Sequence, residues 1–231
     1  MTVAERLLTQ GVLEPGEAIL IRKAQHVFID PVAEWFYTDE TAKPTFSLCD
    51  APTVAPPFPV LWLEYRIDLA WNSNLRTFGA EPRSIPLKTA PRELVARLPR
   101  RVGCLMVYDP YEDGGWHLAW TVFAENGDNQ VIAMHAAVAT ELDGSLVRDC
   151  MLPDETDHYG DDRYEEAMEI LSKYTMPAFL AISFMHCKNV TLADAPAEAL
   201  SHRDQHHLDR ACPPKKFPSL RYHVLEIQPM R

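Results

Sequence analysis

Four apolar segments follow one another between residues 102 and 152, and short links separate them. The links contain Asp-Gly or Asn-Gly, dipeptides that tolerate the positive φ angles of tight hairpin turns. Apolar segments of this length joined by such turns are typical of antiparallel strands. The pattern therefore predicts three successive hairpins, with strands at residues 102–108, 116–124, 130–139 and 145–152.

The remaining segments predict a mixture of helices and strands. The apolar stretch at residues 175–188 has Pro177 in its first turn and predicts a helix buried against a sheet. Periodicity and turn residues predict further helices at 3–10, 163–173 and within 195–209, and further strands at 17–24, 60–71 and 220–227. The predicted fold class is α+β, an antiparallel β-meander core with a C-terminal helical part and a final β-strand.

The chain length of 231 residues fits one domain, since single β-rich domains reach about 200–250 residues. We predict a single domain over residues 1–231. Its parts are a β-rich part at 1–152, an acidic linker at 153–162, and a helical part with the last strand at 163–231.

The formal net charge of −11 comes mainly from one block of the chain. Residues 109–170 contain 16 acidic side chains and only two basic ones, Arg148 and Arg163. This balance excludes a generally basic nucleic-acid-binding protein and makes nucleic acid an unfavourable main ligand. The block has two interpretations: a solvated acidic rim on turns and a helix start, or a surface that binds a basic partner or a cation.

The sequence also favours a reducing compartment. Its five cysteines are widely spaced and form no CxxC pair, which is typical of free thiols. The N-terminal stretch places Glu5 and Arg6 inside its short apolar run, and the longest apolar window, at 176–185, is only about half of the length of about 20 residues that spans a bilayer. We expect a cytoplasmic protein with no membrane partner.

Three stretches of the chain are similar to one known group of proteins. They are PFPVLWLEYRI at 57–67, FLAISFMHCKNVTL at 179–192 and PSLRYHVLEI at 218–227. They resemble proteins without an assigned activity that tailed bacteriophages and prophages encode. The resemblance implies a phage or prophage genome and a bacterial host cytoplasm, but no reaction. In that group the segment before the last strand is strongly basic, whereas residues 201–217 here mix acidic and basic side chains, which weakens a nucleic-acid role.

A cluster of metal-ligand residue types lies late in the chain. His202 and His206 are four residues apart, so a helix would place both imidazoles on one face, and Cys212 follows closely. His186 could complete a zinc site if the two predicted helices pack together. The alternative interpretation is a solvated, histidine-rich helix and loop without metal.

Two further groups of residues are candidate binding groups. Arg97, Arg100 and Arg101 form the densest basic patch, which could contact phosphates, the acidic block of the same chain, or solvent. Trp116 and Trp120 could anchor a protein interface, since aromatic residues are enriched there, but core packing is the default role of tryptophan.

The sequence contains no nucleotide-binding loop, complete metal motif or nucleophile signature. We therefore predict a non-enzymatic accessory protein of phage or prophage type that binds a macromolecular partner, most simply a protein. Two alternatives stay open: a metal-dependent hydrolase that uses the late His/Cys/Asp cluster, and a self-assembling structural or virion-associated protein. A homo-oligomer is compatible with each of them.

Overall fold

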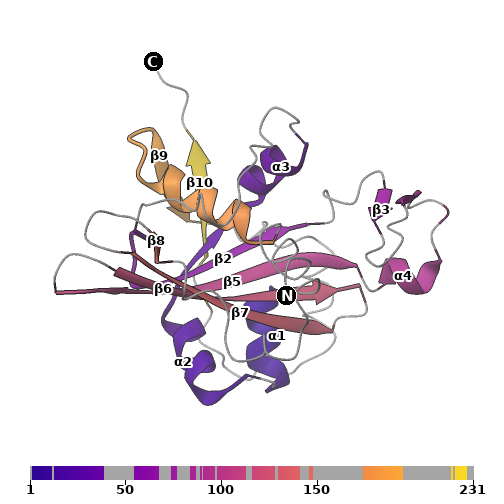
Figure 1. Ribbon diagram of the computed structural model, residues 1–231, viewed down its shortest axis with the longest axis horizontal. Coiled ribbons are helices and arrows are strands. Elements are labelled where there is room, and N and C mark those ends of the chain that lie inside the picture. Colours follow the sequence, from indigo (N-terminus) through magenta and orange to yellow (C-terminus); the bar gives the residue numbers. More distant parts are fainter. Residues whose placement is uncertain are drawn as a thin grey trace.

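A computed structural model places the helices of the chain around one large sheet (Figure 1). It describes residues 2–11, 13–38, 55–67, 74–76, 84–86, 89, 91–96, 98–112, 116–127, 130–140, 146–147, 174–194, 220 and 222–227. The helices are α1 (Val3–Gln10), α2 (Pro15–Lys23), α3 (Asp30–Thr38) and α4 (Arg92–Ala96), and residues 174–185 are also helical. The strands are β1 (Gln25–Phe28), β2 (Val60–Arg66), β3 (Asn74–Arg76), β4 (Ser84–Pro86), β5 (Pro99–Pro110), β6 (Trp116–Asn126), β7 (Val131–Thr140), β8 (Leu146–Val147), β9 (Val190–Asp194) and β10 (Tyr222–Ile227).

The main sheet is mixed, with the strand order β8-β7-β6-β5-β2-β1-β10-β9. β1 runs parallel to both β2 and β10, whereas the other neighbouring strands in the sheet are antiparallel. Helices α1 to α4 all precede β5 in the chain. The predicted fold class, an antiparallel meander core with a C-terminal helical part, is therefore wrong. The prediction failed because β1 pairs with β10 across about 200 residues, a contact that local periodicity does not encode.

The consecutive hairpins themselves are confirmed. β5 pairs with β6, β6 with β7, and β7 with β8, each time in the antiparallel sense. Alternation along β6 sends Trp116, Leu118, Trp120 and Val122 to one face of the sheet and Phe123 to the other, and all five side chains are buried. Both faces of the sheet are therefore covered at β6.

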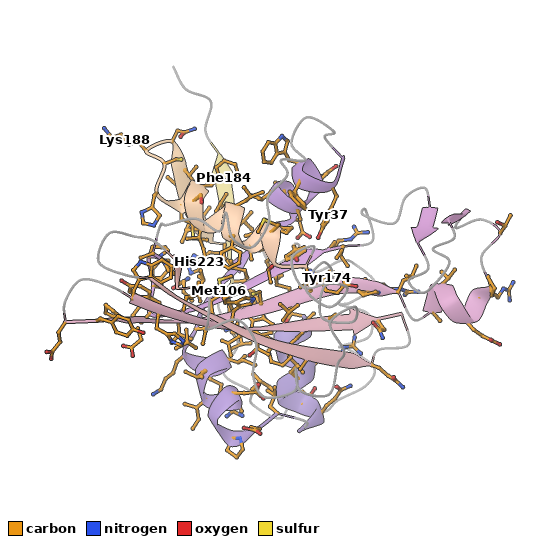
Figure 2. The ribbon with its side chains drawn as sticks, viewed as in Figure 1. Tyr37, Met106, Tyr174, Phe184, Lys188 and His223 are labelled. Carbon is orange, nitrogen blue, oxygen red and sulfur yellow. The ribbon has the colours of Figure 1, made fainter. Side chains whose placement is uncertain are left out.

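Helices cover the two faces of the sheet in pairs (Figure 1). α1 and α2 contribute Val3, Leu7 and Ile21 to an apolar cluster with Trp62, Leu105 and Phe123. α3 and the helical residues 174–185 cover the opposite face, which carries the larger cluster. Figure 2 shows Tyr37, Met106 and Tyr174 among the side chains of that larger layer.

Residues 17–24, predicted as a strand, belong almost entirely to helix α2. A short apolar run such as Ala18 to Ile21 fits a buried strand and a buried helix turn equally well. The deciding signal precedes it: Pro15 occupies the first turn of α2, and Glu14 and Glu17 form a capping box at its N-terminus.

The helix predicted at 175–188 is confirmed in its main part, because residues 174–185 are helical and bury Ala178, Phe179 and Ile182 in the core. The helix at 3–10 and the final strand are also confirmed, as α1 and β10. The helices predicted at 163–173 and within 195–209, and the linker at 153–162, lie outside the described residues.

Within the part of the chain that the structure describes, no helix is long and apolar enough to cross a membrane.

Candidate functional site

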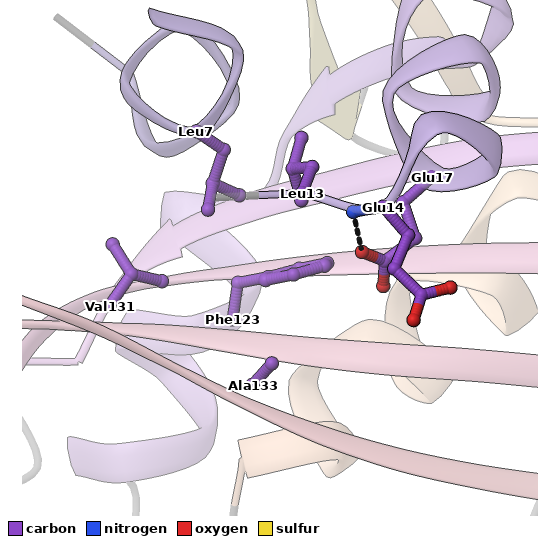
Figure 3. A pocket seen from close by; sticks show the side chains of 7 residues that line it. All are labelled: Leu7, Leu13, Glu14, Glu17, Phe123, Val131 and Ala133. Carbon is purple, nitrogen blue, oxygen red and sulfur yellow. Dashed lines mark hydrogen bonds between the residues drawn. The ribbon is translucent and has the colours of Figure 1, made fainter. Parts of the chain in front are cut away.

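An open cavity of about 330 Å³ lies between helices α1 and α2 and strands β6 and β7. We call it the α1–α2 cleft, and Figure 3 shows its lining. The lining residues are Leu7, Leu13, Glu14, Glu17, Phe123, Val131 and Ala133.

The cleft has a buried floor and an open rim. Leu7 and Phe123 are each only 2% exposed, so packing on the sheet holds them in place. Leu13, Glu17 and Val131 are half-buried, and Glu14 and Ala133 are exposed. A ligand bound here would contact a rigid apolar surface and keep part of its own surface in solvent.

Local sequence explains how the two helices form this cleft. α1 ends at Gly11, whose φ of 65° lies in the left-handed region that glycine adopts without strain. The chain then turns and starts α2 at Pro15, where the Glu14 backbone N–H donates a hydrogen bond of 3.1 Å to Glu17 Oε2. This cap orients the Glu17 carboxylate at the rim of the cleft (Figure 3).

A buried polar group lies on the same face of the sheet and centres on Glu64 of β2, which is 0% exposed. Glu64 Oε1 accepts a hydrogen bond from the Val3 backbone N–H at 3.0 Å, and Glu64 Oε2 accepts one from Trp62 Nε1 at 3.1 Å. Arg101 Nε lies 3.3 Å from Glu64 Oε1. We call Glu64, Val3, Trp62 and Arg101 the Glu64 cluster.

The Glu64 cluster attaches the first turn of α1 to the sheet. A carboxylate at a helix N-terminus meets unpaired backbone N–H groups and the positive end of the helix dipole. Burial raises the pKa of Glu64, and Arg101, the Val3 N–H and the Trp62 indole each oppose that rise. A second ion pair, Arg6 Nη2 to Glu125 Oε1 at 2.8 Å, joins α1 to β6.

Glu64 is a charged residue of β2 that faces the interior of the protein. Its side chain points toward α1 and is fully buried, whereas Arg66 is exposed. The charged residue faces inward because the helix N-terminus and Arg101 supply its partners. Full burial also keeps Glu64 away from any bound molecule, so its role is to position α1.

The structure separates the members of the predicted basic patch. Arg101 pairs with Glu64 and places its guanidinium carbon 5.7 Å from the centre of the Phe28 ring, so it is part of the protein's own packing. Arg100 is exposed at the start of β5, and Arg97 lies outside the described residues.

The two candidate interface tryptophans are core residues. Trp116 is 8% and Trp120 is 2% exposed. Trp120 packs edge to face against Phe179, with 5.3 Å between ring centres, and Trp116 lies 6.0 Å from Tyr108. These side chains face the layer formed by helical residues 174–185 and present no exposed aromatic anchor.

The predicted zinc ligands are only partly described. His186 is exposed, and its Nε2 lies 2.9 Å from the Ala55 carbonyl oxygen. His202, His206 and Cys212 lie outside the described residues. Among the residues that are described, no three His, Cys, Asp or Glu side chains gather in a way that could hold a metal ion. Zinc binding stays a prediction.

Comparisons with models of known protein families, with curated proteins and with solved structures give no match.

Acid should destabilise the protein through His26, which lies beneath α2. Burial lowers its pKa from 6.5 to about 4, and the hydrogen bond between Nε2 and the Ile21 carbonyl, 2.7 Å long, opposes this effect. Between those pH values the unfolded chain binds a proton that the folded chain does not, so stability decreases as the pH falls. We expect this residue to account for a loss of about 2–3 kcal/mol between pH 7 and pH 4.5.

Urea unfolding at both pH values tests this expectation. His26→Gln keeps a side-chain N–H for the Ile21 carbonyl but does not titrate, so its free energy of unfolding should depend less on pH by that amount. Equal pH dependence in the variant and the original protein would contradict it.

Proposed function

We propose that this protein acts by binding a protein partner, and that the α1–α2 cleft receives an anchoring side chain of that partner. The observation that supports the proposal is the combination of a rigid, buried floor at Leu7 and Phe123 with an open rim. Interface anchors fill pockets of this kind, and a few such contacts provide most of the binding energy.

The shape of the cleft favours a protein over a free small molecule. Small-molecule sites measure about 300–1,000 Å³ and enclose most of the ligand surface. The α1–α2 cleft lies at the lower end of that range, and Glu14 and Ala133 at its rim are exposed. A single side chain fits this space while the rest of the partner covers the rim.

The protein acts by binding and carries out no reaction of its own. Its setting, a phage or prophage accessory protein in a bacterial cytoplasm, follows from the resemblance of residues 57–67, 179–192 and 218–227 to such proteins.

Filling the cleft tests the proposal. Ala133→Trp places a large side chain at an exposed position of the lining and removes no core contact. Peptides selected by the original protein from a random-peptide library on beads should bind this variant at least about tenfold more weakly. Fluorescence anisotropy with the selected peptides provides the affinities.

Thr191→Trp is the matched control, because Thr191 is exposed on β9, far along the sheet from β7. It should leave the affinities unchanged. Selected peptides that bind Ala133→Trp as tightly as the original protein, or a library that provides no binding peptide, would refute the proposed site.

A further inference from the structure

The lining of the α1–α2 cleft is divided into an apolar part and an acidic part. Figure 3 shows Leu7, Phe123, Val131 and Ala133 along the helix and sheet surfaces, and both carboxylates together at the start of α2. A ligand that spans the cleft therefore meets apolar carbon at one end and negative charge at the other.

Both carboxylates are held in place by the start of α2. Glu17 Oε2 accepts the Glu14 backbone N–H at 3.1 Å, and the Glu14 side chain accepts the backbone N–H of Glu17. Each hydrogen bond uses one carboxylate oxygen and leaves the other oxygen available to a ligand. The arrangement is preorganised, so a cation binds it without ordering flexible side chains first.

The charge at this position lacks a partner within the described chain. Neither Glu14 nor Glu17 forms an ion pair with a described lysine or arginine, in contrast to Glu64 and Glu125 on the same face of the sheet. Two neighbouring carboxylates without such an ion pair create a local negative potential that a cationic group would neutralise.

Resting on the proposed function, we infer that the anchoring side chain is an arginine of the partner. The aliphatic part of an arginine side chain covers apolar surface such as Leu7 and Phe123, and its charged head stays at the open rim. The guanidinium group is planar, carries five N–H donors and is weakly hydrated, which suits two carboxylates beside an apolar floor. A hydrated metal ion would make no apolar contact with Leu7 and Phe123.

Peptide selection provides the first part of the test. Peptides chosen from the random library for binding to the original protein should be enriched in arginine. Replacing the arginine in a selected peptide with citrulline, which keeps the shape and removes the charge, should weaken binding about tenfold. Raising the salt concentration from about 0.05 M to about 0.5 M should weaken the arginine peptide much more than the citrulline peptide.

Protein variants provide the second part. In the double variant Glu14→Gln with Glu17→Gln, each glutamine retains a side-chain oxygen for the cap of α2, and the unfolding temperature checks that the fold is intact. It should lose about tenfold in affinity for the arginine peptide and nothing for the citrulline peptide. Glu93→Gln removes an exposed carboxylate on α4 and should change neither affinity.

The outcomes separate the two proposals. Peptides that Ala133→Trp excludes, but that show no arginine enrichment and no response to the double variant, would overturn the arginine inference and keep the cleft as the binding site. Peptides that Ala133→Trp does not exclude would overturn both.

Discussion

Replacing Glu64 with alanine is expected to lower the free energy of unfolding by about 3–5 kcal/mol, which corresponds to a decrease of roughly 6–20 °C in unfolding temperature. The substitution removes the acceptor of the Val3 N–H and of the Trp62 indole N–H, and it leaves the Arg101 guanidinium without its buried partner. Val3 and Trp62 are 0% exposed, so their N–H groups would lose a hydrogen bond without gaining water in exchange, and Arg101 would lose its ion pair.

Denaturant unfolding measures the loss of stability, and amide hydrogen exchange measures how firmly the first turn of α1 stays attached to the sheet. The first turn of α1 should exchange faster in Glu64→Ala, because its N-terminal attachment to the sheet is gone. Glu64→Gln is the control: it retains one acceptor oxygen and nearly the same shape, so it should lose clearly less stability than Glu64→Ala. If Glu64→Ala loses less than about 1 kcal/mol, the cluster does not hold α1 in place.

The second large effect is expected at Gly103, which lies opposite Glu64 in the β2–β5 pair. The Trp62 indole covers Gly103, so a Cβ atom at position 103 would lie 2.6 Å from Trp62 Cη2 and still closer to Cζ2. Trp62 is 0% exposed and packs in the cluster with Leu105 and Phe123, so the ring cannot turn out toward solvent without losing core contacts. Gly103→Ala should therefore lower the free energy of unfolding by about 1–3 kcal/mol, although alanine is favoured over glycine in a strand.

A double-mutant cycle identifies the cause of that loss. Trp62→Leu removes the ring atoms that the new methyl group would meet, so Gly103→Ala should be nearly neutral in the Trp62→Leu background. An equal loss in both backgrounds would show that the indole contact does not explain the cost.

The sequence predicts those parts of the fold that depend on local pattern. Asn126-Gly127 and the two Asp-Gly links separate strands that do pair as antiparallel neighbours. Pro177 and its apolar neighbours belong to a helix buried against the sheet. In each case the signal and the structure lie within a few residues of one another.

The parts that failed depend on distant contacts or on ambiguous short runs. β1 is only four residues long, and its two parallel neighbours in the sheet, β2 and β10, are distant from it in the sequence. The run at residues 18–21 fits either structure until the capping residues Glu14 and Glu17 are considered, and the prediction placed Glu17 at the start of a strand. The mixed sheet therefore could not be derived from local periodicity.

The candidate site required packing information as well. Leu7, Phe123 and Ala133 come from three elements that meet only after α1 has docked on the sheet. Glu64 resembled an outward residue of an alternating strand, because sequence alternation identifies a face but not what covers that face. The capping pattern of α2 was the one local signal that could have located the acidic rim.

The position of β10 between β1 and β9 also determines the order in which the sheet can assemble. A ribosome releases β9 before β10, and β9 joins the described sheet only through β10. The hairpins of β5 to β8 pair residues that are close in the sequence, so they can form early. The pairing of β1 with β10 can form only after β10 has been synthesised, about 200 residues later. Until then the backbone groups on that edge of β1 lack their β10 partners, and the short length of β1 limits incorrect pairing there.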